Sequence, residues 1–351
     1  MMSQDRLRTA ILGLTAKGQQ LLEAAGATGL FDIVAVADGD PELAEKIARK
    51  YKCASFNDYR QLVIQNRLDV LFVAAPIHLC DEYVRAAMKK KFSILKLIPP
   101  GLDFEHTAEL MRLAKKERIR FAAANAHRFD PGFCKLRDYL ASEDTEDFHL
   151  ITAVCNVPGS LDGPAGRWLS DPQLAGGGVL LRNSYQLIDL ITLNFGIPQQ
   201  VYSLNTNRAP DRQQRLSITE DTAIVTMKFS DTLVANLIAS RVFGPPRQVL
   251  RIHGRDKLLT VSKDNFTLCD NLGKIIDEFK YDCSESESTA KMLKNFAQGL
   301  FSPDKNQPVV DGNADLNNMA VIESAYLSAR TSMPEEPLKI LDMVGTGPTN
   351  I

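Results

Sequence analysis

The first 125 residues alternate apolar runs with segments whose apolar residues have helical spacing. Runs such as 31–38 (FDIVAVAD) and 68–76 (LDVLFVAAP) are nearly continuous in Val, Ile, Leu and Ala. Such runs are typical of parallel strands that are covered on both faces. The segment 40–51 begins with Asp-Pro, a usual helix N-terminus. The pattern predicts an α/β domain with a doubly wound parallel sheet.

Beyond residue 150 the pattern changes to short runs separated by turn residues. The runs 222–230 and 232–240 flank Asp231 like the arms of a hairpin. Further strand candidates follow at hairpin-like intervals, and 316–330 has the pattern of an amphipathic helix. We expect an α+β domain with a large, mostly antiparallel open sheet. The predicted domains are 1–125, a Rossmann-type dinucleotide-binding domain, and 126–351, a substrate and dimerisation domain.

One stretch, 176–190 (GGGVLLRNSYQLIDL), places three glycines before an apolar segment that contains few polar residues. Taken as one helix from Val179, Arg182, Gln186 and Asp189 lie at i, i+4 and i+7 on one face. The stretch therefore predicts a polar stripe on an apolar helix. The pattern leaves open whether this stripe is catalytic, binds a ligand or only satisfies buried polar groups.

Composition narrows the classes of function. The 351 residues are 44% hydrophobic and 24% charged, with a net charge of −2, as in ordinary globular proteins. We expect neither a nucleic acid nor a membrane as partner. The N-terminus has no signal pattern, so we expect a cytoplasmic protein. The six cysteines lack CxxC spacing and the five histidines lack pairwise ligand spacing, so we expect no metal.

A glycine loop follows the first predicted strand. The segment 13–18 (GLTAKG) fits G-x-G-x-x-G except that Thr15 replaces the second glycine between Gly13 and Gly18. Asp38 ends the second strand, where an acid binds a ribose 2′-hydroxyl, and Gly39 offers no cation for a 2′-phosphate. The cofactor indicated is NAD, with NADP as the alternative. A Rossmann-like scaffold that holds no nucleotide is the competing interpretation.

Residues after other strand ends complete the candidate set. Pro76 ends the run 68–76 and His78 follows it, at the edge where α/β sheets bind ligands, and we expect both beside the cofactor. His127 follows a later strand end and is a candidate acid or base, although it could instead hydrogen-bond backbone.

Several motifs carry a resemblance to a known family. They are 36–51 (VADGDPELAEKIARKY), 56–63 (FNDYRQLV), 68–79 (LDVLFVAAPIHL), 125–133 (NAHRFDPGF) and 167–196 (RWLSDPQLAGGGVLLRNSYQLIDLITLNFG). With them the chain resembles the Gfo/Idh/MocA (glucose–fructose oxidoreductase / inositol dehydrogenase / MocA) family. The resemblance implies hydride transfer between a nicotinamide and a sugar, inositol or related polyol. It also implies a homodimer or homotetramer formed through the C-terminal sheet.

The departures from the family pattern fall on its functional positions. Ile98 stands where the family's E-K-P lysine polarises the reacting group. Arg182 corresponds to the family's aspartate and Gln186 to its proton-carrying histidine, whereas Asp189 matches. Neither isoleucine nor glutamine exchanges a proton near neutral pH. The resemblance therefore implies altered or lost activity.

Other residues are candidates to replace the family's missing catalytic side chains. Lys96 lies two positions before Ile98, but it could simply cap the sheet or pair with an acid. Tyr185 points away from the stripe if the helix is continuous. Arg182 suits an anionic ligand, or else an ion pair with an acid such as Asp189. Trp168 is expected to pack in the core.

Two classes of function remain open. The first is an NAD(P)-dependent oxidoreductase that acts on a polyol or an acidic sugar derivative, with Lys96, His127, Arg182 and Gln186 as candidate catalytic-site residues. The second is a non-catalytic relative that binds a small molecule or regulates a partner. A lyase or epimerase is a third, less favoured reading.

Overall fold

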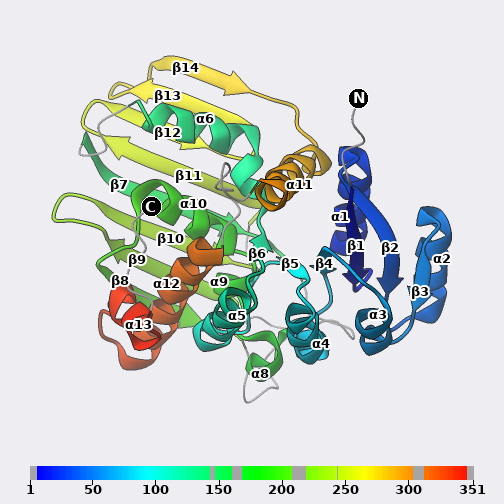
Figure 1. Cartoon of the computed structure of the whole chain (residues 1–351). Helices are drawn as coiled ribbons and strands as arrows, with labels where there is room; N and C mark the ends of the chain where they lie inside the picture. The colour runs from blue at the N-terminus through cyan, green and yellow to red at the C-terminus, as the bar shows by residue number, and fades with distance from the viewer. Residues whose placement is uncertain are drawn as a thin grey trace. The chain divides into compact units, whose positions relative to one another are not determined.

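The computed structural model describes residues 6–142, 147–159, 168–207, 219–242, 244–302 and 312–345 (Figure 1). The chain divides into two compact units. Unit 1 is Met1–Gly101, Ala108–Ala126 and Ser284–Gly312, and unit 2 is Leu102–Thr107, His127–Cys283 and Asn313–Ile351. The chain thus returns to unit 1 at 284–312, a segment that the sequence analysis assigned to the second domain.

Unit 1 contains a six-stranded parallel sheet in the order β3-β2-β1-β4-β5-β6. Its strands are β1 (Leu7–Leu12), β2 (Phe31–Ala37), β3 (Ala54–Phe56), β4 (Val70–Val73), β5 (Ser93–Leu97) and β6 (Phe121–Ala124). Strand β4 is buried along its whole length, as its uninterrupted apolar sequence requires. The predicted doubly wound sheet is confirmed.

Helices alternate with these strands. They are α1 (Ala16–Thr28), α2 (Pro41–Tyr51), α3 (Tyr59–Gln65), α4 (Ile77–Lys89), α5 (Phe104–Glu117) and α11 (Glu285–Phe301). Helix α2 begins as predicted, because the Asp40 side chain accepts hydrogen bonds from the backbone N–H groups of Glu42 and Leu43. Helix α11 packs against α1, and Lys17 forms an ion pair with Glu285.

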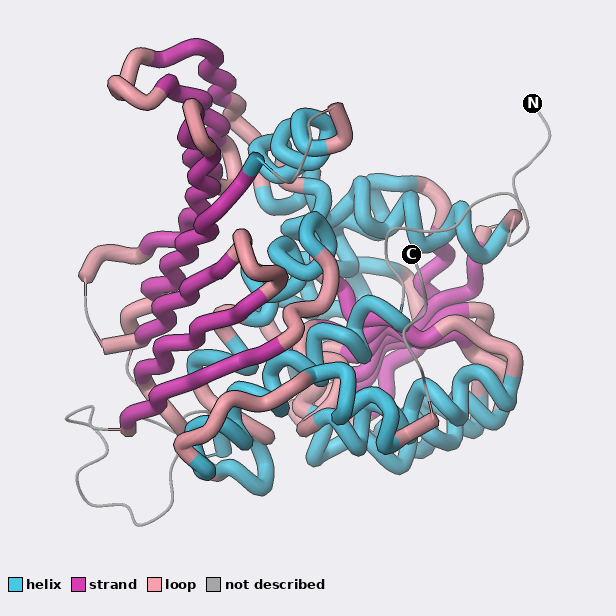
Figure 2. The backbone as a smooth tube through the Cα atoms, turned by 90° about the vertical axis from the view of Figure 1, so that its left-hand side faces the viewer, coloured by secondary structure: helices cyan, strands magenta, loops and turns pink. Residues whose placement is uncertain are grey.

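Unit 2 contains an eight-stranded sheet in the order β14-β13-β12-β11-β7-β10-β9-β8, whose strands Figure 2 shows in magenta. The strands are β7 (Phe148–Asn156), β8 (Gln200–Thr206), β9 (Thr222–Lys228), β10 (Val234–Ser240), β11 (Arg247–Gly254), β12 (Lys257–Val261), β13 (Asn265–Asp270) and β14 (Ile275–Lys280). Among the eight described strands of this sheet, only β10 and β7 pair in parallel, so the mostly antiparallel sheet is confirmed.

Helices pack on one face of this sheet. The remaining helical segments are η1 (Ala126–Phe129), α6 (Pro131–Leu140), α8 (Pro172–Ala175), α9 (Val179–Arg182), α10 (Tyr185–Phe195), α12 (Gly312–Thr331) and α13 (Pro337–Met343). Helix α6 contacts β12 and β13, and α9 contacts β9 and β10. In β9 buried and exposed residues alternate, as expected for a sheet with one covered face.

The expected continuous helix from Val179 to Asp189 is wrong. Helix α9 ends at Arg182 and α10 begins at Tyr185. Two contacts stabilise the break: the Ser184 hydroxyl donates to the Val179 carbonyl at 2.9 Å, and the Cys155 thiol donates to the Asn183 carbonyl at 3.2 Å. Arg182 therefore lies on a different helix from Gln186 and Asp189, and the predicted single stripe does not form.

Candidate functional site

The glycine loop of unit 1 is a close-packed turn between β1 and α1. Gly13 has a φ of +87°, and a Cβ there would overlap the backbone of Ala75. A Cβ at Gly18 would lie 2.6 Å from the Gly13 carbonyl oxygen. Both glycines are therefore required by the packing of strand, turn and helix.

Thr15 and Asp38 make internal contacts in this loop. Thr15 is the N-cap of α1, and its hydroxyl accepts a hydrogen bond from Gly18 N–H at 3.2 Å. One Asp38 carboxylate oxygen accepts from Leu14 N–H at 2.6 Å and the other from Asp40 N–H at 3.0 Å. Thr15 thus uses one of the N–H groups that a helix N-terminus offers to a phosphate.

The turn after β4 lies beside the glycine loop. The backbone N–H groups of Ala74 and Ala75 both donate to the Leu12 carbonyl at 2.8 Å, which joins the ends of β4 and β1. Pro76 is the N-cap of α4, and the half-buried His78 lies in the first turn of that helix. Among the predicted cofactor residues, Gly13 and Gly18 are thus joined to the turn that leads into Pro76.

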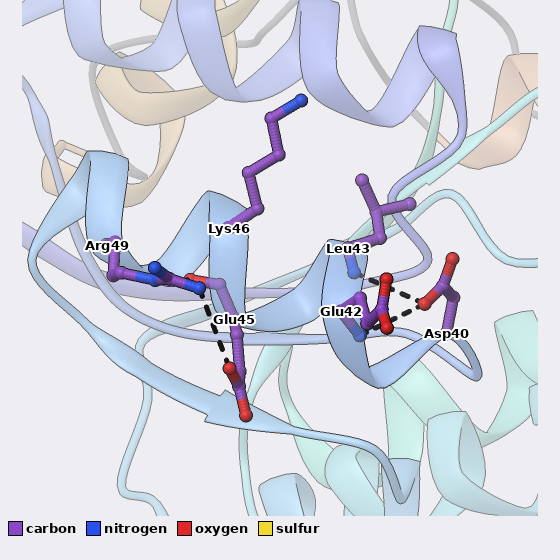
Figure 3. Close-up of a pocket in the computed structure, with 6 residues that line it drawn as sticks. All are labelled: Asp40, Glu42, Leu43, Glu45, Lys46 and Arg49. Atoms are coloured by element: carbon purple, nitrogen blue, oxygen red, sulfur yellow. Dashed lines mark hydrogen bonds and ion pairs between the residues drawn. The ribbon is translucent and has the colours of Figure 1, made fainter.

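A pocket lies along helix α2 (Figure 3). Asp40, Glu42, Leu43, Glu45, Lys46 and Arg49 line it. Arg49 and Glu45 form an exposed ion pair at 3.6 Å, and the Asp40 carboxylate accepts the cap hydrogen bonds. Because these charges are exposed and partly neutralise one another, the pocket does not define a specific ligand.

Lys96 is buried at the end of β5, with 4% of its surface exposed. Its Nζ donates to the Leu97 carbonyl at 3.0 Å and to the Pro99 carbonyl. The ammonium therefore caps the carbonyl groups of the turn that contains Ile98. Ile98 itself is half-buried and has no polar side-chain atom.

The three consecutive glycines Gly176, Gly177 and Gly178 of unit 2 each allow a close approach of another segment. A Cβ at Gly176, whose φ is +77°, would overlap the Leu102 carbonyl, and one at Gly178 would overlap the Glu220 carbonyl. A Cβ at Gly177 would overlap the Tyr326 hydroxyl. The glycine run is thus explained by packing inside unit 2.

Glu220 is a buried carboxylate at the beginning of α9. It accepts hydrogen bonds from Gly178 N–H at 2.8 Å, Leu180 N–H at 2.9 Å and the Tyr326 hydroxyl at 2.9 Å. Burial raises the pKa of Glu220, while these donors act in the opposite direction. Both carboxylate oxygens of Glu220 are therefore occupied by structural hydrogen bonds.

Arg182 ends α9 beside this carboxylate without bonding to it. Its Nη2 donates to the Ala175 carbonyl at 2.6 Å, and its guanidinium carbon lies 4.6 Å from the centre of the Trp168 ring. Its Nε is buried without a hydrogen-bond partner. Burial lowers the pKa of Arg182 to about 10, although Tyr326 and Glu220 raise it in part. Trp168 therefore stacks on a cation that the described residues do not neutralise directly.

The alternative ion pair between Arg182 and Asp189 is wrong, because Asp189 pairs with Arg128. Arg128 donates from Nε to Asp189 at 2.6 Å and also from Nη2, and both side chains are buried. Asn318 donates to the same carboxylate. Burial opposes the charge on Arg128, but Asp189 outweighs it and raises the pKa of Arg128.

Two neighbours on α10, Tyr185 and Gln186, are both buried. The Tyr185 hydroxyl donates to Asp315 at 2.7 Å and is fully buried, and burial raises the pKa of Tyr185. Gln186 is 7% exposed. Tyr185 therefore contributes to the core of unit 2.

His127 and Asp130 form a pair in the segment after β6. His127 Nδ1 lies 2.6 Å from an Asp130 carboxylate oxygen, and the side chains are 28% and 2% exposed. Asp130 is also the N-cap residue of α6. A carboxylate beside Nδ1 orients the imidazole and favours the tautomer that carries its proton on Nδ1.

Sequence reasoning did not find Glu220, Tyr326 or Asp130. Their partners lie in other elements: Glu220 bonds to residues about 40 positions earlier and 106 positions later. Asp130, in contrast, follows His127 by three positions, so its spacing offered a usable signal.

Among the residues that the structure describes, no cluster of three or more His, Cys, Asp or Glu could hold a metal ion. None of the helices in those ranges is long and apolar enough to cross a membrane.

Comparison with known proteins agrees with this architecture. D-xylose 1-dehydrogenase (NADP(+)) 2 from Haloferax volcanii is 22% identical over 337 residues, 93% of this chain and 98% of that protein. A Saccharopolyspora spinosa dTDP-3,4-didehydro-2,6-dideoxy-alpha-D-glucose 3-reductase is 25% identical over 127 residues, 36% of this chain and only 38% of that protein. The solved structure of levoglucosan dehydrogenase with NADH and levoglucosan has a TM-score of 0.84 at 16% identity, covering 95% of this chain and 99% of that one.

Two family models match most of the chain. Residues 7–124 match the oxidoreductase family with an NAD-binding Rossmann fold, and residues 133–260 match the GFO/IDH/MocA C-terminal domain. The matched ranges correspond to the glycine loop and parallel sheet on one side and to the region of the Gly176–Gly178 run on the other. The chain therefore belongs to the Gfo/Idh/MocA oxidoreductase family.

Proposed function

We propose that this protein is a nicotinamide-dependent oxidoreductase with an altered proton-transfer apparatus, acting on a sugar, polyol or acidic sugar derivative. The geometry of the loop Gly13–Gly18 is the observation that carries the proposal, since its glycines keep the packing on which dinucleotide binding depends. NAD is the expected cofactor, with NADP as the alternative. We expect the protein to act in the cytoplasm.

The residues of unit 1 fit such a cofactor with one departure. The backbone of residues 14–17 would hold the pyrophosphate and Asp38 the ribose hydroxyls, with Pro76 and His78 beside them. The departure is Thr15, whose hydroxyl already accepts from Gly18 N–H. When bound, the nicotinamide ring gives or accepts a hydride.

The proton must then be carried by a group outside the family positions. Ile98 has no proton, Gln186 exchanges none near neutral pH, and Lys96 donates to two backbone carbonyls. His127 is the better candidate, because Asp130 orients it and its side chain is partly exposed. His127→Gln is expected to lower turnover by about 10²–10⁴-fold without changing NADH affinity.

The cofactor step is tested by titrating the purified protein with NADH and NADPH and following ligand fluorescence. Thr15→Gly is expected to bind NADH about fivefold to tenfold more tightly, because it frees the Gly18 N–H. Thr15→Ser keeps the hydroxyl and should leave the affinity unchanged. If neither coenzyme binds to the protein or to Thr15→Gly, the proposed function is wrong.

A non-catalytic ligand-binding or regulatory protein is the second candidate. It is favoured by the occupation of Lys96 and Tyr185 in structural hydrogen bonds. This candidate predicts ligand binding without NADH oxidation on any sugar or sugar acid. NADH turnover that His127→Gln abolishes would exclude it.

We further propose that the open face of the unit 2 sheet forms a homodimer or homotetramer. Adjacent positions on four strands carry Leu204, Ile224, Ile238 and Val154, and Leu204 and Ile224 are 57% and 41% exposed. Light scattering should give at least twice the chain mass of 38.9 kDa. Ile224→Lys should reduce that mass to one chain.

A further inference from the structure

Arg182 is a cation whose hydrogen-bonding capacity is largely unused. A guanidinium has five N–H donors, and the described residues accept one bond, at the Ala175 carbonyl. The Nε is buried without a partner, so its N–H has lost water and gained nothing in return. An arrangement of this kind is costly unless another group completes it.

The neighbouring acids do not complete it. Asp189 is bound by Arg128 and Asn318. Glu220 accepts from two backbone N–H groups and from Tyr326, and its carboxylate does not lie within ion-pair distance of Arg182. The two acids most suited to neutralise Arg182 therefore make hydrogen bonds to other groups of the fold.

The contacts that Arg182 does make hold it in one orientation. The Trp168 ring lies against the guanidinium at 4.6 Å, and the bond to Ala175 fixes one end of the fork. A planar, oriented guanidinium matches a carboxylate through two parallel hydrogen bonds. Trp168 therefore positions the cation, which extends the role in core packing expected from the sequence.

The choice between a carboxylate and a phosphate follows from charge. Among the described residues, Arg182 hydrogen-bonds the Ala175 carbonyl and stacks on the Trp168 ring, and neither of these groups carries a charge. One guanidinium neutralises the single charge of a carboxylate, whereas a phosphate monoester carries nearly two charges at neutral pH. The balance favours a monoanion.

We propose that Arg182, stacked on Trp168, is a subsite for the carboxylate of a sugar acid. This inference deepens the proposed function by naming its substrate class, and it rests on that function only for the sugar framework. Carboxylate binding at Arg182 can be measured without a coenzyme, so its failure is distinguishable from failure of NADH binding.

The test is isothermal titration of the full chain with D-glucuronate and D-galacturonate, each compared with its neutral counterpart, D-glucose or D-galactose. The protein should bind at least one of the acids more tightly than its neutral sugar. Arg182→Met, which keeps an apolar chain against Trp168, should lose at least about tenfold in affinity for that acid. Arg330→Gln is the control, since that arginine is 68% exposed on α12, and it should bind like the unaltered protein.

Four results would overturn the proposal. The first two are equal binding of the acid and the neutral sugar, and unchanged acid binding by a folded Arg182→Met. The others are tighter binding of D-glucose 6-phosphate than of either acid, and absence of acid binding at millimolar concentration. The NADH titration of the same variants shows whether the cofactor site is intact, and Arg182→Lys, which keeps the charge without the fork, should bind with intermediate affinity.

Discussion

Two arginines of unit 2, Arg128 and Arg182, have opposite surroundings. Arg128 is fully matched: Asp189 accepts two of its hydrogen bonds, and the pKa of Arg128 is raised despite burial. Arg182 has one carbonyl partner and an aromatic ring, and burial lowers its pKa to about 10. The same side chain is thus completed inside the protein at one position and left incomplete at the other.

The difference distinguishes an arginine that stabilises the fold, Arg128, from one that is a candidate for binding a ligand, Arg182. The Arg128–Asp189 pair joins the segment after β6 to α10 and α12, and both residues match the family motifs. The Gly176–Gly178 run is likewise explained by close packing. Positions that match the family therefore hold unit 2 together, whereas Arg182 and Gln186, which depart from it, have few hydrogen-bond partners among the described residues.

The largest effect is expected when the matched arginine loses its partner. Asp189→Ala leaves Arg128 buried and uncompensated, so the free energy of unfolding should fall by about 3–5 kcal/mol. Urea denaturation followed by circular dichroism measures it. A loss below about 1 kcal/mol would show that the two arginines do not differ as described.

Next in size is the loss of close packing before Arg182. Gly178→Ala places a Cβ against the Glu220 carbonyl and should cost about 1–3 kcal/mol of unfolding free energy. Gly39→Ala is the matched control, because a Cβ there meets nothing within 4 Å. Equal stability of the two variants would contradict the packing account of the glycine run.

A smaller effect is expected at the incomplete arginine. Arg182→Met removes one hydrogen bond but also an uncompensated buried charge, so stability should change by less than about 1 kcal/mol. The same urea experiment measures it. If the loss equals that of Asp189→Ala, Arg182 is a structural residue and the comparison fails.

The smallest effect concerns pH. Arg182 remains charged below its pKa of about 10, and the carboxyl group of a sugar acid is ionised well below neutrality. Affinity for D-glucuronate should therefore stay constant between about pH 6 and about pH 9. A decline with a midpoint near ~6.5 would instead indicate that a histidine contributes to binding.

Much of the fold could be predicted from local patterns in the sequence. The apolar runs of unit 1 and the hairpin around Asp231 predicted strands that the structure contains, and Asp40-Pro41 predicted the beginning of α2. The break between α9 and α10 was not accessible, because hydrogen bonds from Cys155 and Ser184 stabilise it. Nor was the return of 284–312 to unit 1, which depends on the packing of α11 against α1.

The residue types of the candidate site could be predicted from the sequence, but which side chains form hydrogen bonds or ion pairs with one another could not. The sequence pattern placed Arg182, Gln186 and Asp189 on one face of a single predicted helix. The partner of Asp189 lies 61 residues earlier, and Glu220 lies on another segment. Spacing within one helix cannot rank such distant partners, which is why the sequence left an Arg182–Asp189 ion pair open as an alternative.

The central claim is that a ligand carboxylate completes Arg182, and the arginine's own N–H reports on it most directly. In a ¹H–¹⁵N spectrum of arginine Nε groups, the signal absent from Arg182→Met belongs to Arg182. The account predicts that D-glucuronate or D-galacturonate moves this signal, that the matching neutral sugar does not, and that the Arg128 signal stays in place. An Arg182 signal that both acids leave unchanged at saturating concentration would contradict the claim.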